Sequence, residues 1–112
     1  MDKQKISGLM GLCVRARQAI FGEDGCMKSL RSGQCGLLLM DEAISDRVRE
    51  KYLGICERCG VPYAILPEGM IFDATGRPGM AIAVLKGPLA ERLSSCADAR
   101  QYTSNADERR GC

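Results

Sequence analysis

Residues 19–40, AIFGEDGCMKSLRSGQCGLLLM, decide the fold of this chain. The stretch begins with a short apolar segment at 19–21, which runs into the glycine-flanked acidic turn GEDG at 22–25. It ends with residues 37–40, which are apolar at every position and therefore predict a strand buried on both faces. The segment in between has room for one short helix. We expect a strand, a helix and a strand in immediate succession.

The helix of this stretch is expected over about residues 25–32. Asp24 is a suitable N-cap, because its carboxylate can accept hydrogen bonds from the N–H groups of the first turn. Gly33 suits the left-handed position that ends many helices. Lys28 and Arg31 lie on the same helix. A helix N-terminus, a mobile glycine-rich backbone and two cations are therefore expected at one point of the surface.

The remaining sequence continues this alternation of helices and strands. The other predicted elements are a helix with apolar face 6–14, a helix from 45 to 59, a strand at 62–66, a weak helix to about 75, a strand at 80–85 and a helix from about 88. Apolar strands separated by helices indicate a sheet that is covered on both faces. We predict an α/β protein, a three-layer α/β/α sandwich with a four-stranded, mostly buried mixed sheet. It spans residues 1–96 as one domain, and residues 97–112 form a polar tail without periodicity that is predicted to be disordered.

The composition restricts the classes of function. The 112 residues are 46% hydrophobic, which suffices for one sizeable core, and the net charge is only +2. Such a charge is too small for binding nucleic acid by bulk attraction, so any such binding requires a local site. The chain has no histidine, and histidine is the commonest general base and metal ligand. Without a nucleophile–base pair, we expect no enzyme, no catalytic residue, no cofactor, no metal and no small-molecule substrate.

The cysteines and the N-terminal sequence predict where the protein resides. Seven cysteines, an odd number, are scattered along the chain, and no apolar core of a signal peptide is visible. No run approaches the roughly 18 apolar residues that a membrane span requires. We therefore expect a cytoplasmic protein with mostly buried thiols and no membrane partner.

One motif suggests metal or redox chemistry, but its context favours a plainer interpretation. Cys56 and Cys59 form a CxxC pair, which lacks the second pair or histidines of a zinc site. Redox pairs lie at the N-terminus of a helix, where the dipole lowers the pKa of the thiol. Here the pair ends a helix just before Gly60. We expect two thiols that face the core.

The acidic turn suits nucleobases better than phosphates. It matches neither of the glycine-rich phosphate-binding patterns. Glu23 and Asp24 would repel phosphate, yet their carboxylates can accept hydrogen bonds from base amines. Lys28 can donate to guanine O6 and N7, and Arg31 can reach backbone phosphates. The plain alternative is an N-capped helix with two solvated cations.

A second candidate loop precedes the last predicted strand. It consists of Arg77, Pro78, Gly79 and Met80. A rigid, partly apolar loop of this kind can receive one unstacked base, with Arg77 stacking on the base or pairing with its phosphate. The plain alternative is an ordinary connection before a strand.

The two loops and the order of elements resemble the kink-turn RNA-binding ribosomal protein family, of L-seven-Ae, L-thirty-e and Gadd-like fold, and most of all its bacterial YlxQ-like branch. The resemblance covers about residues 4–95. Three stretches carry it: GLMGLCVRARQAIFGEDGCMKSLRSGQCGLLLMDEAISD, CGVPYAIL and TGRPGMAIAVLKGP. It implies the same α/β/α sandwich, and as partner a structured RNA, either a kink-turn or an internal loop of ribosomal RNA, with the ribosome as a further candidate.

The family pattern after the first strand is Gly-x-Asn-Glu-x-x-Lys, in which Asn and Glu read sheared G·A pairs and Lys contacts guanine. Gly22 and Lys28 match this pattern, whereas Asp24 replaces Asn and Gly25 replaces Glu. Asp cannot donate a hydrogen bond, and Gly has no side chain to offer. The residues and the resemblance together predict RNA binding through residues 22–25, Lys28, Arg31 and residues 77–80. The alternative is a protein-interaction module of the same fold that has lost kink-turn recognition.

Overall fold

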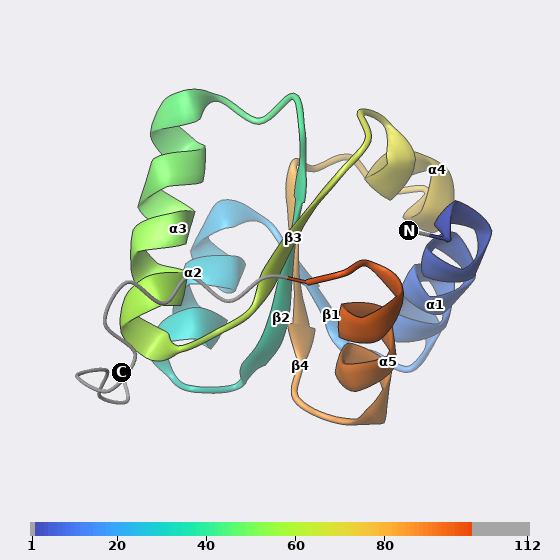
Figure 1. Cartoon of the computed structure of the whole chain (residues 1–112), viewed down its shortest axis with the longest axis horizontal. Coiled ribbons are helices and arrows are strands. Elements are labelled where there is room, and N and C mark those ends of the chain that lie inside the picture. Colours follow the sequence, from blue (N-terminus) through green and yellow to red (C-terminus); the bar gives the residue numbers. More distant parts are fainter. Residues whose placement is uncertain (1, 100–112) are drawn as a thin grey trace.

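The computed structural model describes residues 2–99, which form one layered unit (Figure 1). Five helices and four strands alternate along this part of the chain. In order they are α1 (Lys3–Arg15), β1 (Ala19–Phe21), α2 (Glu23–Arg31), β2 (Cys35–Asp41), α3 (Asp46–Cys59), β3 (Tyr63–Leu66), α4 (Met70–Thr75), β4 (Ala81–Leu85) and α5 (Pro88–Cys96). The predicted fold class and order of elements are confirmed.

The four strands form a single mixed sheet in the order β1-β4-β2-β3. β2 pairs with β3 in parallel, whereas β4 is antiparallel to both of its neighbours, β1 and β2. The strand that comes last in the sequence therefore lies inside the sheet. This order brings the end of β1 and the start of β4 to the same end of the sheet, where Phe21 lies opposite Ile82.

Helices cover both faces of the sheet (Figure 1), and an apolar core lies on each face. α1, α4 and α5 pack on one face with Leu37 and Leu39 of β2. α2 and α3 pack on the other face with Leu38 and Met40. All four of these side chains are fully buried, as predicted for residues 37–40. β3 is an edge strand and departs from this pattern, because Ile65 is exposed.

The predicted start of α2 is wrong. The helix begins at Glu23, and its N-cap is Gly22, with φ +88° and no side-chain hydrogen bond to the first turn. Gly22 adopts a left-handed conformation that a residue with a side chain rarely takes, so the chain turns into the helix before it reaches Asp24. Asp24 instead lies in the first turn, where its charge suits the helix dipole. Gly33 follows the helix with φ +79°, as predicted.

The ends of α3 match the sequence more closely. Ser45 is the N-cap, and its hydroxyl accepts a hydrogen bond from the N–H of Val48. Gly60 ends the helix in the left-handed conformation. Of the CxxC pair, Cys56 is a fully buried free thiol, whereas Cys59 is half-buried, packs against the same core and is disulfide-bonded.

The last described residues continue the packing of α5. Ala97 is buried, and Ala99 packs against the same core. The rest of the predicted tail, residues 100–112, lies outside the described residues. No helix among residues 2–99 is long and apolar enough to cross a membrane. Within the same residues, no three side chains of His, Cys, Asp or Glu gather where they could hold a metal ion.

Candidate nucleic-acid interface

The first predicted loop lies at the exposed N-terminus of α2. Gly22, Glu23 and Asp24 are exposed there, and Lys28 and Arg31 are exposed further along the helix. Both cations lie on the helix whose first turn carries the two carboxylates. The helix therefore presents hydrogen-bond acceptors in its first turn and positive charges in its last turn.

The structure explains why position 25 is a glycine, which the sequence alone did not reveal. A Cβ atom built at this position would lie 2.8 Å from Cγ2 of Ile20 in β1. Carbon atoms do not approach that closely without a shift, so α2 packs on β1 at a distance that only glycine allows at this point. Gly25 is half-buried against the strand, and no side chain projects from it into the interface.

The second predicted loop is exposed and is fixed to the same end of the sheet. The guanidinium of Arg77 lies over the ring of Phe21, with Cζ 4.5 Å from the ring centroid. This is a cation–π contact between the second loop and the last residue of β1. The N–H of Arg77 donates to the hydroxyl of Thr75 at 3.2 Å. One face of the guanidinium is thus occupied by a protein ring.

The two loops line one open pocket of about 490 Å³, called the base pocket below. Its lining residues are Gly22, Glu23, Ala43, Ile44, Ser45, Val48, Tyr52, Pro78, Gly79, Met80 and Ala81. Met80 is 48% exposed, whereas Ile44 is buried at 6%. The pocket is lined largely by apolar residues, and the exposed residue Glu23 lies at its rim. Its shape and chemistry suit a flat group with an apolar face and polar edges, such as a nucleobase.

Residues 43–45 and the start of α3 belong to this pocket, and the sequence analysis did not predict them. They follow directly on β2, and their position just after a buried strand is the signal that could have identified them. Asp41, only 4% exposed, holds this segment in place. Its Oδ1 accepts from the N–H of Ala43 at 2.7 Å, and its Oδ2 accepts from the N–H of Gly69 at 2.9 Å.

A groove between α2 and α3 adjoins the base pocket and is called the α2–α3 groove. It is lined by Glu23, Asp24, Met27, Lys28, Arg31, Ser32 and Lys51. Nζ of Lys51 lies 3.0 Å from Oε2 of Glu23. Lys51 was not predicted as a site residue, because nothing in its local sequence shows that α3 lies beside α2. The predicted site residues divide between the two hollows. The base pocket is lined by Gly22, Glu23, Pro78, Gly79 and Met80. The groove is lined by Glu23, Asp24, Lys28 and Arg31, whereas Gly25 and Arg77 line neither.

The buried thiols of the core beneath α2 and α3 are not nucleophiles. Burial raises the pKa of Cys26, whose thiol donates to the carbonyl of Ile20. Burial likewise raises the pKa of Cys35 to about 11 and that of Cys56 to about 12. Only the thiolate attacks or ligates, so near neutral pH these three groups act as small apolar side chains.

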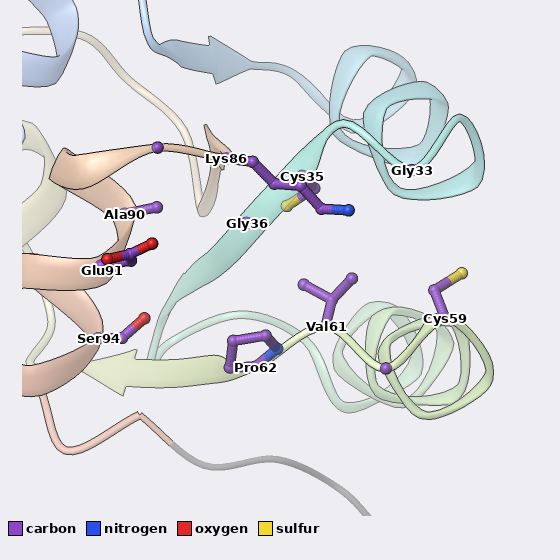
Figure 2. A pocket seen from close by; sticks show the side chains of 12 residues that line it. Gly33, Cys35, Gly36, Cys59, Val61, Pro62, Lys86, Ala90, Glu91 and Ser94 are labelled. Carbon is purple, nitrogen blue, oxygen red and sulfur yellow. The ribbon is translucent and has the colours of Figure 1, made fainter. Parts of the chain in front are cut away.

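Another open pocket lies at the opposite end of the sheet (Figure 2). It is bounded by the start of β2, by Val61 and Pro62 before β3, and by α5. Lys86 and Glu91 provide one charge of each sign at its rim. None of the predicted site residues lines it, so the predicted interface belongs to the other end of the sheet.

The comparisons with known proteins give related sequences and the same fold. No family model matches the chain. The chain is 29% identical over 92 residues to the RNA-binding protein YlxQ of Bacillus subtilis, covering 80% of this chain and 92% of that protein. A solved structure of a protein with unknown function from Bacillus halodurans C has 26% identity and a TM-score of 0.80, covering 84% of this chain and 97% of the other.

A more distant structure shares only the fold. It is the 15.5kD RNA binding protein of Giardia lamblia, with 15% identity and a TM-score of 0.69, covering 85% of this chain and 86% of the other. Sequence and fold agree over nearly the whole described region. The chain therefore resembles the YlxQ-like branch of the L-seven-Ae-type proteins, as its sequence indicated.

Proposed function

We propose that this protein binds structured RNA through the base pocket and the exposed face of α2, and that it is not an enzyme. The observation that carries the proposal is the shared pocket, because loops more than fifty residues apart in the sequence, represented by Gly22 and Met80, line it together. Two of the similar proteins are named as RNA-binding proteins, which supports the same class of partner here.

Each group has a role that follows from its chemistry. Glu23 and Asp24 accept hydrogen bonds from exposed base amines, and Lys28 donates to guanine O6 and N7. Arg31 holds a backbone phosphate. Pro78, Gly79 and Met80 line the base pocket and cover an unstacked base that enters it. Arg77, which does not line the pocket, pairs with the phosphate of that base.

The proposed RNA is a kink-turn or a related internal loop, with ribosomal RNA as the candidate source and the ribosome as the candidate setting in the cytoplasm. An internal loop presents unstacked bases whose edges a protein can reach, which a regular A-form duplex does not. The exposed rim and largely apolar lining of the base pocket suit a base of this kind. The binding domain is taken as residues 1–96, with the remaining residues as a tail.

The first prediction concerns Lys28. We expect Lys28→Ala to weaken binding to a folded kink-turn RNA by about 1–3 kcal/mol, the value of a good contact to a guanine edge. Affinities are measured by gel shift at one fixed salt concentration, with a plain duplex of equal length as competitor. Lys86→Ala is the matched control, because it removes an equally exposed positive charge at the other end of the sheet. Equal affinity of the wild type for kink-turn and duplex would refute the proposed specificity.

A second candidate function is a protein-interaction module of the same fold. Gly25 favours it, because the packing of α2 on β1 leaves no carboxylate at this position to read bases. Gel shifts against total cellular RNA, followed by mapping of protected sites, separate the two functions. Protected internal loops support RNA binding, whereas no retained RNA supports the interaction module.

A further inference from the structure

The α2–α3 groove is continuous with the base pocket, because Glu23 lines both. From Glu23 the groove follows the exposed side of α2 to Arg31 and Ser32. A nucleic acid with a base in the pocket has to continue beyond it, and the groove is a surface that leads away from the pocket. The residues of the groove therefore face the nucleotides that adjoin the bound base.

The groove carries more positive than negative charge. Its three cations are Lys28, Arg31 and Lys51, and its two carboxylates are Glu23 and Asp24. Lys28 and Arg31 form no ion pair with any other residue of the described region. Unpaired cations along a groove of this kind suit the phosphates of a nucleic-acid backbone.

Lys51 differs from these two cations because it is paired. Its ammonium lies 3.0 Å from the carboxylate of Glu23, and the side chains of Lys51 and Glu23 are 53% and 46% exposed. The neighbouring Tyr52 is buried and fixes the orientation of α3, so Lys51 stays on the side of the groove. An exposed ion pair between two flexible side chains contributes little to stability, and either partner can exchange.

We infer that Lys51 is a further RNA-backbone contact of the site, which Glu23 neutralises in the free protein. The inference rests on the proposed RNA-binding function. A phosphate that enters the groove replaces the Glu23 carboxylate as the partner of Lys51. Glu23 is then released toward the base pocket, where it accepts a hydrogen bond from a base N–H. The exchange couples backbone binding in the groove to base reading in the pocket.

The test uses the full chain and a hairpin RNA that contains a kink-turn between two long stems. Binding is measured as a function of KCl concentration. We expect Lys51→Ala to lower the slope of log K against log salt by about 1, the effect of one lost phosphate contact. Lys51→Arg retains the slope, and Lys86→Ala, which changes the net charge equally, leaves it unchanged.

Two further measurements locate the contact. Each stem of the RNA is shortened in turn, and Lys51→Ala is expected to lose its effect on the RNA that lacks the stem over the groove. The effects of Glu23→Gln and Lys51→Ala are expected to be non-additive, because each removes one member of the same pair. Far-UV circular dichroism checks that the variants are folded.

The outcomes separate the proposed RNA-binding function from the inference about Lys51. If Lys28→Ala weakens binding but Lys51→Ala leaves both affinity and salt slope at the wild-type values, the inference about Lys51 is overturned and the proposed function stands. Additive effects of Glu23→Gln and Lys51→Ala overturn the exchange. If the wild-type protein does not bind the kink-turn hairpin, both the proposed function and the inference fail.

Discussion

Packing within the protein explains why position 25 is a glycine, since α2 lies too close to β1 there for a side chain. Gly25→Ala places a methyl group 2.8 Å from Cγ2 of Ile20. Alanine gains about 1 kcal/mol over glycine from helix propensity, but forcing a group into a packed contact costs about 1–3 kcal/mol. We expect net destabilisation of up to about 2 kcal/mol, measured by urea denaturation.

Gly54 is the matched control, because it lies within α3 with nothing within 4 Å of its would-be Cβ. Gly54→Ala is expected to stabilise the protein by about 1 kcal/mol. Ile20→Ala, which removes the clashing atom, should make Gly25→Ala less costly in the double variant. If Gly25→Ala stabilised the protein, Ile20 could shift at little cost, and packing against β1 would not explain the glycine at position 25.

At the scale of elements, Asp41 joins the connection between β2 and α3, which lines the base pocket, to the connection between β3 and α4. Its two carboxylate oxygens accept from the N–H groups of Ala43 and Gly69. Asp41→Asn leaves one acceptor oxygen and turns an amide donor toward the other N–H. Because the site is buried, the unsatisfied group is expected to cost about 1–3 kcal/mol of the free energy of unfolding.

The measurement for Asp41 is again chemical denaturation, combined with hydrogen exchange of the Ala43 and Gly69 amides. Asp73→Asn serves as control, because Asp73 is an exposed carboxylate on α4. Unchanged exchange at both amides in Asp41→Asn would contradict the role assigned to Asp41.

The elements were predictable where a local pattern specifies them. The apolar run at 37–40 predicted a doubly buried strand, and the pattern of residues 45–59 followed by Gly60 predicted the helix α3; both were confirmed. Asp24 was wrongly predicted as a cap, because both Gly22 and Asp24 are common N-caps and only the backbone conformation decides between them.

The candidate site was predictable only in part, because it is assembled by the order of the strands. Glu23 and Pro78 meet in the base pocket since β1 pairs with β4. Ile44 and Lys51 join the site since β2 adjoins β4 and α3 packs beside α2. No short-range pattern encodes these neighbours, so residues outside the two recognisable loops were missed.

At the scale of the whole molecule, the buried thiols make the free energy of unfolding fall as the pH rises in the alkaline range. Burial raises the pKa of Cys35 to about 11 and that of Cys56 to about 12, from an ordinary value of 9.0. Between pH 9 and the raised pKa of each thiol, that thiol has lost its proton in the unfolded chain but keeps it in the folded chain. Stability is therefore fully present below about pH 9 and falls as the pH rises, by up to about 1.4 kcal/mol per pH unit for each thiol.

The measurement is urea denaturation under reducing conditions from pH 8 to 10.5. Cys56→Ala is expected to lower stability at pH 8, because it leaves a small cavity, but to flatten the decline above pH 9. Cys96→Ala is the control, since Cys96 is only half-buried. Parallel curves for the wild type and Cys56→Ala would contradict the assignment.

The interior position of β4 has a consequence for how the protein is made. While residues 81–85 are still to be synthesised, β1 has no strand to pair with, because β4 is its neighbour in the sheet. Until then only the parallel pair of β2 and β3 can form, and one edge of the apolar β2 is open to strands of other nascent chains. The sheet closes when β4 inserts between β1 and β2, so the domain acquires its structure late in translation rather than segment by segment.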